Sequence, residues 1–129
     1  MRLNHLDLHV PDIATTADFL IRHFGLTLID MRGNNGLAIL SDGAGLELVL
    51  SHPVPKFGGT DQVSRHAVSY HIGFIVDDRD EVDRVHAALR DDGAELLGEP
   101  RDMRGGWAFY CIAPGNILVE ISARPLLVG

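Results

Sequence analysis

Residues 3–12, Leu-Asn-His-Leu-Asp-Leu-His-Val-Pro-Asp, decide the fold because strict alternation ends abruptly at a helix-start signal. Leucine and valine occupy positions 6, 8 and 10, so they share one face of a strand. The opposite face carries His5, Asp7 and His9. The stretch therefore predicts a strand that is apolar on one side and bears chemically active groups on the other.

The residues that follow predict one helix and three strands. An apolar stripe of helical period runs from Pro11-Asp12 to about residue 24, and Gly25 stands where a left-handed C-terminal cap belongs. Strands are expected near 27–32, 36–41 and 45–51, separated by Gly/Asn/Asp turn residues. This half of the chain reads as a βαβββ module over about residues 2–51.

The second half repeats this plan. A strand over 68–76 leads to a helix that starts with Asp78 and ends at Gly93, and strands follow near 95–98, 106–112 and 116–122. The span from His5 to Gly25 is 20 residues, and that from His71 to Gly93 is 22. We therefore predict an α+β fold in one domain, residues 1–129. Its two tandem βαβββ modules, about 2–51 and 68–123, are joined by a Pro/Gly-rich linker over 52–67.

Composition narrows the function. The net charge of −7, without clustered Lys or Arg, argues against nucleic acid as a partner. No run reaches 18 apolar residues, so no membrane span is predicted, and the N-terminus lacks the apolar stretch of a signal peptide. The single cysteine, Cys111, excludes an internal disulfide, suits the reducing cytoplasm and reads as a buried filler.

Four of the predicted strands share a pattern that points to chemistry. Each has a uniformly apolar face, expected under a helix, and a His or Glu on the opposite face, where the first strand also carries His9. These residues are His5, Glu47, His71 and Glu120. A lone strand Glu or His usually faces solvent or is a satisfied structural group, but two of each at matching places in two repeats favour a shared metal site.

The donor set indicates which metal such a site would hold. Two neutral imidazoles and two carboxylates balance the charge of one divalent cation. The set suits Ni²⁺, Zn²⁺, Co²⁺, Fe²⁺ or Mn²⁺ and is too rich in nitrogen for Ca²⁺ or Mg²⁺. A six-coordinate metal would keep two positions open for two adjacent oxygens of a small-molecule substrate and act as a Lewis acid.

Short motifs at these positions resemble the vicinal oxygen chelate superfamily, which includes glyoxalase I, bleomycin-resistance proteins and ring-cleaving dioxygenases. The similarity covers residues 2–123 and is most specific at four places: 3–6, 46–48, 70–74 and 118–121. The resemblance implies a U-shaped mixed sheet that encloses the metal, with helices on its outer face, and a homodimer. The His, Glu, His, Glu order resembles glyoxalase I most closely.

The resemblance also implies a mechanism. Glu47 and Glu120 would be both ligands and the acid/base pair, moving a proton next to a carbonyl through a metal-stabilised enediolate. Glutathione-using glyoxalases carry Arg and Asn where this chain has His9 and Ser51, so glutathione is not implied. The family turn before the last strand is replaced by residues 113–116, Ala-Pro-Gly-Asn, which still fit a turn because Gly and Asn tolerate positive φ.

Five further residues are candidates for substrate contact, each with a simpler alternative. Asp7 and His9 share the face of His5 and either support the site or meet solvent. Trp107 and Phe109 either line an apolar pocket or pack in the core. Arg104 either contacts an anion or belongs to a surface loop.

Three functions compete. The first is a metal-dependent lyase or isomerase of the glyoxalase type, acting on a small α-oxygenated carbonyl compound. The second is a metal-free protein that sequesters an antibiotic or other metabolite, which would not need four ligands. The third is an extradiol-type dioxygenase that uses only His5, His71 and Glu120, in which Glu47 would occupy a position that O₂ chemistry needs open.

Overall fold

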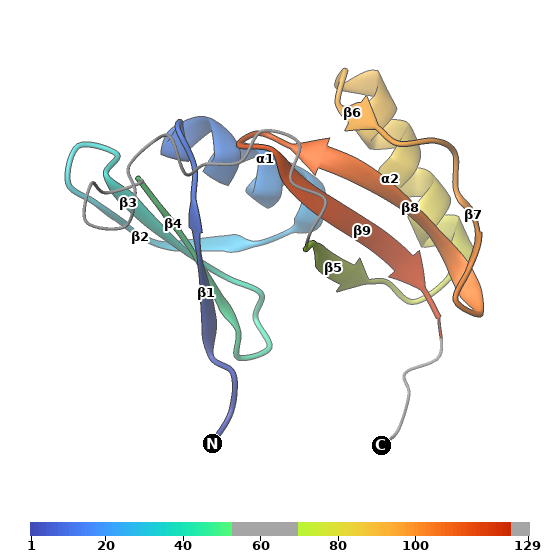
Figure 1. The fold of residues 1–129 in the computed structure, drawn as a ribbon, viewed down its shortest axis with the longest axis horizontal. Coiled ribbons are helices and arrows are strands. Elements are labelled where there is room, and N and C mark those ends of the chain that lie inside the picture. Colours follow the sequence, from blue (N-terminus) through green and yellow to red (C-terminus); the bar gives the residue numbers. More distant parts are fainter. Residues whose placement is uncertain (53–69, 125–129) are drawn as a thin grey trace. The chain divides into compact units, whose positions relative to one another are not determined.

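The computed structural model describes residues 1–52 and 70–124, and these form two compact units. Unit 1 contains residues 1–52 and 114–116, and unit 2 contains residues 70–113 and 117–124. In each unit one helix covers one face of a mixed sheet (Figure 1). The predicted α+β class and tandem βαβββ plan are confirmed. The expected linker lies outside the described residues except for His52.

Unit 1 follows the predicted order closely. Its sheet has the strand order β1-β4-β3-β2, with β1 parallel to β4 and the other neighbours antiparallel. The predicted boundaries hold to within two residues. The elements are β1 (His5–His9), α1 (Ile13–Phe24), β2 (Thr27–Arg32), β3 (Leu37–Ser41) and β4 (Glu47–Ser51).

Local signals at both ends set the length of α1. The side chain of Asp12 accepts a hydrogen bond from the backbone N–H of Thr15 at 3.0 Å, which satisfies one free donor of the first turn. Gly25 adopts the left-handed conformation (φ 69°), and its N–H donates to Ile21. The apolar stripe of α1 then packs on β3 and β4, where Leu40 and Leu50 are fully buried.

Unit 2 adds one strand to the prediction. Its sheet has the order β5-β9-β8-β6, and β7 pairs with another part of β8. Arg104 and Gly105, expected in a loop, form a two-residue turn with positive φ (50° and 78°) that returns the chain from β7 into β8. The elements are β5 (Ile72–Ile75), α2 (Arg79–Asp91), β6 (Glu95–Leu96), β7 (Arg101–Met103), β8 (Gly106–Ala113) and β9 (Ile117–Ala123).

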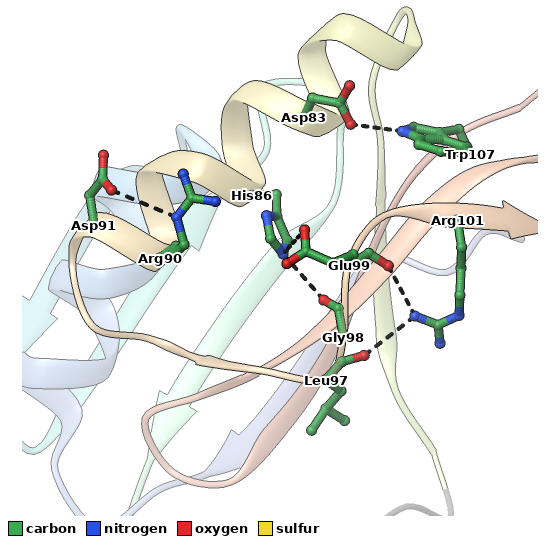
Figure 2. A network of polar contacts seen from close by, with 9 residues as sticks. All are labelled: Asp83, His86, Arg90, Asp91, Leu97, Gly98, Glu99, Arg101 and Trp107. Atoms are coloured by element: carbon green, nitrogen blue, oxygen red, sulfur yellow. Dashed lines mark hydrogen bonds and ion pairs between the residues drawn. The ribbon is translucent and has the colours of Figure 1, made fainter.

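Polar contacts fasten α2 to its surroundings (Figure 2). The indole N–H of Trp107 in β8 donates to Asp83 of α2 at 2.8 Å. His86 of α2 is only 3 % exposed, and its Nε2 lies 3.2 Å from the carbonyl oxygen of Gly98. His86 is thus a buried residue and not a surface one. It lies four residues after the buried Val82, so it falls on the packed side of the helix, where the carbonyl satisfies its ring.

The turn at residues 114–116 belongs to unit 1 and confirms the predicted backbone conformation. Gly115 and Asn116 both have positive φ, 88° and 60°. The hydroxyl of Thr16 lies 3.3 Å from the carbonyl oxygen of Pro114. A Cβ built on Gly115 would lie 2.7 Å from Cγ1 of Val10, so this glycine is required by both conformation and space.

Gly115→Ala should lower the free energy of unfolding by about 3 kcal/mol, because a left-handed alanine costs about 1 kcal/mol and the clash with Val10 adds about 2. Gly43→Ala is the matched control, since Gly43 has φ 78° but open space around its Cβ position. It should lose only about 1 kcal/mol. Urea unfolding measures both variants, and equal losses would contradict the close approach at Gly115.

Candidate functional site

In unit 1 the first predicted ligand pair lies side by side. His5 and Glu47 are Cα partners in the parallel ladder between β1 and β4, so they project from neighbouring strands on one face. The next residues along each strand, Leu6 and Leu48, are also partners and face the side covered by α1. The alternation quoted from the sequence therefore places the His–Glu pair on the uncovered face of the sheet.

The ring of His5 has a partner that suits a metal ligand. Its Nδ1 lies 3.0 Å from the side-chain oxygen of Asn4. With the proton on Nδ1, the ring donates to Asn4 and keeps the lone pair of Nε2 free for a cation. Asp7 and His9 continue the same face as predicted, and Asp7 accepts a hydrogen bond of 2.6 Å from the hydroxyl of Ser51.

In unit 2 the central feature is a buried carboxylate. Glu120 lies in the middle of β9 and is 5 % exposed, with Gly73 and Tyr110 as its Cα partners on the two adjacent strands. The hydroxyl of Tyr110 donates to Oε1 of Glu120 at 2.9 Å. The guanidinium of Arg104 lies 3.7 Å from the same oxygen. A buried carboxylate needs such partners because its desolvation is otherwise very costly.

Tyr110 also contacts the second predicted ligand of this unit. His71 immediately precedes β5, two residues before Gly73 and hence on the face of Glu120. Its ring meets the ring of Tyr110 edge-on, with centroids 5.3 Å apart and planes at 89°. Burial, and next the hydrogen bond to Glu120, raise the pKa of Tyr110 above its ordinary value, so the phenol remains a donor at neutral pH.

Sequence reasoning missed Tyr110, although a signal was available. The β8–β9 hairpin turns at residues 114–116, and residues equally distant from Gly115 pair across it. Tyr110 and Glu120 each lie five residues from Gly115 and are paired in the structure. The predicted turn together with the predicted ligand would have identified this tyrosine.

Two of the predicted substrate contacts lie on the opposite face of β8. Phe109 is fully buried and packs edge-on against the ring of His86 in α2. Trp107 contacts α2 through Asp83, and the guanidinium of Arg79 lies 4.9 Å from its ring centroid. These contacts favour the packing alternative for both aromatic residues. Arg104, in contrast, lies beside Glu120.

The repeat is less symmetrical than the sequence suggested. Val10 lies five residues after His5 and donates its N–H to Ser51, and Val76, five after His71, donates to Ser122, both at 2.9 Å. Glu47 lies four residues before its serine, but Glu120 lies only two before its own. The two histidines therefore occupy equivalent positions in the two units, and the two glutamates do not. Residues two apart share a face of a strand, so alternation could not reveal the offset of about 7 Å.

Each unit thus offers one histidine and one glutamate on the side of its sheet opposite the helix. Throughout residues 1–52 and 70–124, no three His, Cys, Asp or Glu side chains gather closely enough to hold a metal ion. The chemistry of the combined donor set still fits one divalent cation. Glu120 supplies a partly satisfied buried carboxylate, and His5 has an orienting partner on its far nitrogen.

Comparison with known proteins identifies the family. The model of the Glyoxalase/Bleomycin resistance protein/Dioxygenase superfamily matches residues 2–121. The chain belongs to this superfamily. Members of the superfamily differ widely in chemistry, so membership by itself leaves the reaction open.

Solved structures agree with this family assignment. A possible glyoxalase from Bacillus cereus is 30 % identical, with a TM-score of 0.78 over 94 % of this chain and 97 % of that one. The genomically encoded fosfomycin resistance protein FosX from Listeria monocytogenes is 24 % identical, with a TM-score of 0.76 over 98 % and 95 %. Lactoylglutathione lyase from Agrobacterium tumefaciens is 19 % identical, with a TM-score of 0.70 over 95 % and 92 %. The last two likenesses concern the fold alone.

No curated protein sequence matches the chain. Neither helix in the described ranges has the length or apolar character that crossing a lipid bilayer requires.

Cys111 should be inert in the folded protein. Burial raises the pKa of its thiol from 9.0 to about 12, so the thiolate is scarce at pH 8. Iodoacetamide should label the native protein at least about tenfold more slowly than the urea-unfolded chain. The same pKa shift makes the free energy of unfolding depend on pH. The folded state keeps its full stability below about pH 9 and loses stability as the pH rises toward 12, because the unfolded chain releases the thiol proton first. Equal labelling rates would contradict the buried position.

Proposed function

We propose that the protein is a divalent-metal-dependent lyase or isomerase that acts on a small α-oxygenated carbonyl substrate. In this proposal His5, Glu47, His71 and Glu120 hold the metal. The main support is that each unit has a histidine and a glutamate on the side of its sheet opposite the helix, including the buried and hydrogen-bonded Glu120. Burying a carboxylate in the middle of a strand costs free energy, and a glutamate without a role at this position could remain in solvent instead.

The donor set supports a borderline transition metal. Two imidazole nitrogens and two carboxylate oxygens suit Ni²⁺, Zn²⁺, Co²⁺, Fe²⁺ or Mn²⁺ better than Ca²⁺ or Mg²⁺. When bound, the metal would supply Lewis-acid polarisation of a substrate oxygen. The acid/base work remains for the protein side chains.

The surroundings of the two glutamates support different roles. Glu120 is buried, and one of its oxygens accepts a hydrogen bond from the hydroxyl of Tyr110. Glu47 is half-buried, and within the described residues its carboxylate has no side-chain hydrogen bond or ion pair. A base must rotate toward the substrate and accept a proton, so we assign that role to Glu47. Its carboxylate takes the proton from the carbon next to the carbonyl and returns it to the neighbouring carbon.

Substrate contacts are assigned by charge and position. Arg104 is exposed and adjacent to Glu120, so it can bind an anionic group of the substrate. Asp7 and His9 share the face of His5 and can bind polar groups. FosX is a fosfomycin resistance protein, and the Agrobacterium protein is a lactoylglutathione lyase. Both have the same fold as this chain. We infer a homodimer from the family resemblance.

One observation favours a second candidate. The offset of Glu47 from the position equivalent to Glu120 is what a three-ligand site of His5, His71 and Glu120 would show. Such a site suits an extradiol-type dioxygenase with open metal positions. The two candidates differ in whether Glu47 contributes to metal affinity.

Protein purified without chelators or affinity nickel should carry about one divalent ion per chain. Glu120→Gln should lose most of this metal while the fold survives, because glutamine can still accept the Tyr110 hydroxyl. Elemental analysis and circular dichroism measure the two effects. Glu95→Gln, at an exposed position in β6, is the matched control and should keep its metal. Absence of metal in the parent protein, with no uptake of Ni²⁺, Co²⁺ or Zn²⁺, would instead support a metabolite-sequestering protein.

Glu47→Gln should separate the two metal-dependent candidates. For a ligand that is also the base, the variant should bind Co²⁺ at least about tenfold more weakly. At saturating metal it should also lose about 10²–10⁴-fold in α-proton exchange. NMR in D₂O on a panel of 2-hydroxy and 2-oxo carbonyl compounds measures the exchange. Unchanged Co²⁺ affinity would favour the three-ligand site.

A further inference from the structure

We propose that Tyr110 is the positioning residue of unit 2, holding Glu120 through its hydroxyl and His71 through its ring. This inference rests on the proposed metal site. It concerns a residue that neither binds the metal nor reacts but fixes the two side chains that do. Tyr110 is the residue in β8 that touches both.

The position of Tyr110 follows from strand pairing. It is the Cα partner of Glu120 in the antiparallel β8–β9 ladder, so the two side chains leave the sheet together on the same face. β9 lies between β8 and β5, and Gly73 of β5 is the partner of Glu120 on the other side. The carboxylate is thus flanked by a large aromatic side chain on one strand and by no side chain on the other.

The hydrogen bond selects which carboxylate oxygen is free. The Tyr110 hydroxyl and the Arg104 guanidinium both approach Oε1, at 2.9 and 3.7 Å. Oε2 lies on the side of β5, 3.7 Å from where a Cβ on Gly73 would stand. The strand on that side is the one preceded by His71. The donor from Tyr110 therefore leaves the oxygen nearer β5 as the one available for a cation.

The ring of Tyr110 packs against the ring of His71. Within the described residues the imidazole of His71 has no hydrogen bond, and it is exposed to solvent. Its edge-on contact with Tyr110 restricts the rotation of a side chain that would otherwise sample several rotamers. A ligand whose orientation is already restricted loses less conformational freedom when it binds.

The test compares the Co²⁺ affinity of three tyrosine variants with that of the parent protein. The affinity is measured by titrating Co²⁺ into each metal-free protein in a calorimeter. Tyr110→Phe removes only the hydroxyl and should weaken Co²⁺ binding about tenfold. Tyr110→Leu removes both contacts and should weaken it about a hundredfold. Tyr70→Phe is the matched control, because Tyr70 is the other tyrosine of the chain, is 65 % exposed and should bind Co²⁺ like the parent.

A spectroscopic measurement separates positioning from general destabilisation. At saturating Co²⁺ the visible absorption bands of Tyr110→Phe should change in position and intensity, because a reoriented Glu120 alters the ligand field. Those of Tyr70→Phe should not. Circular dichroism and the urea midpoint verify that the variants are folded, and the conservative Tyr110→Phe tests the hydroxyl even if Tyr110→Leu does not fold.

The possible results are distinguishable. If the parent protein binds Co²⁺ and Tyr110→Phe matches it in both affinity and spectrum, Tyr110 is not a positioning residue and the proposed metal site stands. Equal losses in Tyr110→Phe and Tyr70→Phe would likewise overturn the inference. If the parent itself binds no metal, the proposed function fails and the inference fails with it.

Discussion

A carboxylate buried in the middle of a strand constrains unit 2 more than any other group. Glu120 has lost almost all of its solvent, so the surrounding residues must replace the hydration of its charge. Tyr110 supplies a hydrogen bond, and Arg104 supplies a positive charge from the turn between β7 and β8. A glycine on the third strand leaves space beside the remaining oxygen. The unpredicted β7 therefore has a clear consequence, since its turn brings Arg104 to this carboxylate.

Because side chains alternate along each strand, residues that pack against the helix lie on one face and the polar candidate-site residues lie on the other. On β8, Phe109 faces α2 in the core, while its neighbour Tyr110 faces Glu120. The same separation in unit 1 places leucines under α1 and the His5–Glu47 pair on the uncovered face. Substitutions on the helix-facing side should therefore mainly lower the stability of the protein, whereas substitutions on the opposite side should mainly affect the ligand binding proposed above.

The two units share a plan without being copies of each other. The histidines occupy equivalent places relative to the backbone bonds that end each parallel ladder, but the glutamates are offset by two residues. Glu47 is consequently paired directly with His5, whereas Glu120 is paired with Gly73 and held by Tyr110. Two chemically identical groups therefore have different burial and different hydrogen-bond partners, which is the physical basis for assigning them different roles.

The sequence by itself determined the α+β class, the tandem βαβββ order, most element boundaries and the sharing of a face by His5 and Glu47. Alternation, helix caps and turn residues are local properties, and each can be read within a few residues. Tertiary structure decided the buried state of His86, the contact of Tyr110 with both Glu120 and His71, and the offset of the two glutamates. These depend on strand register and helix packing, where segments far apart in the chain meet. A period of two defines a face but cannot define a register along it.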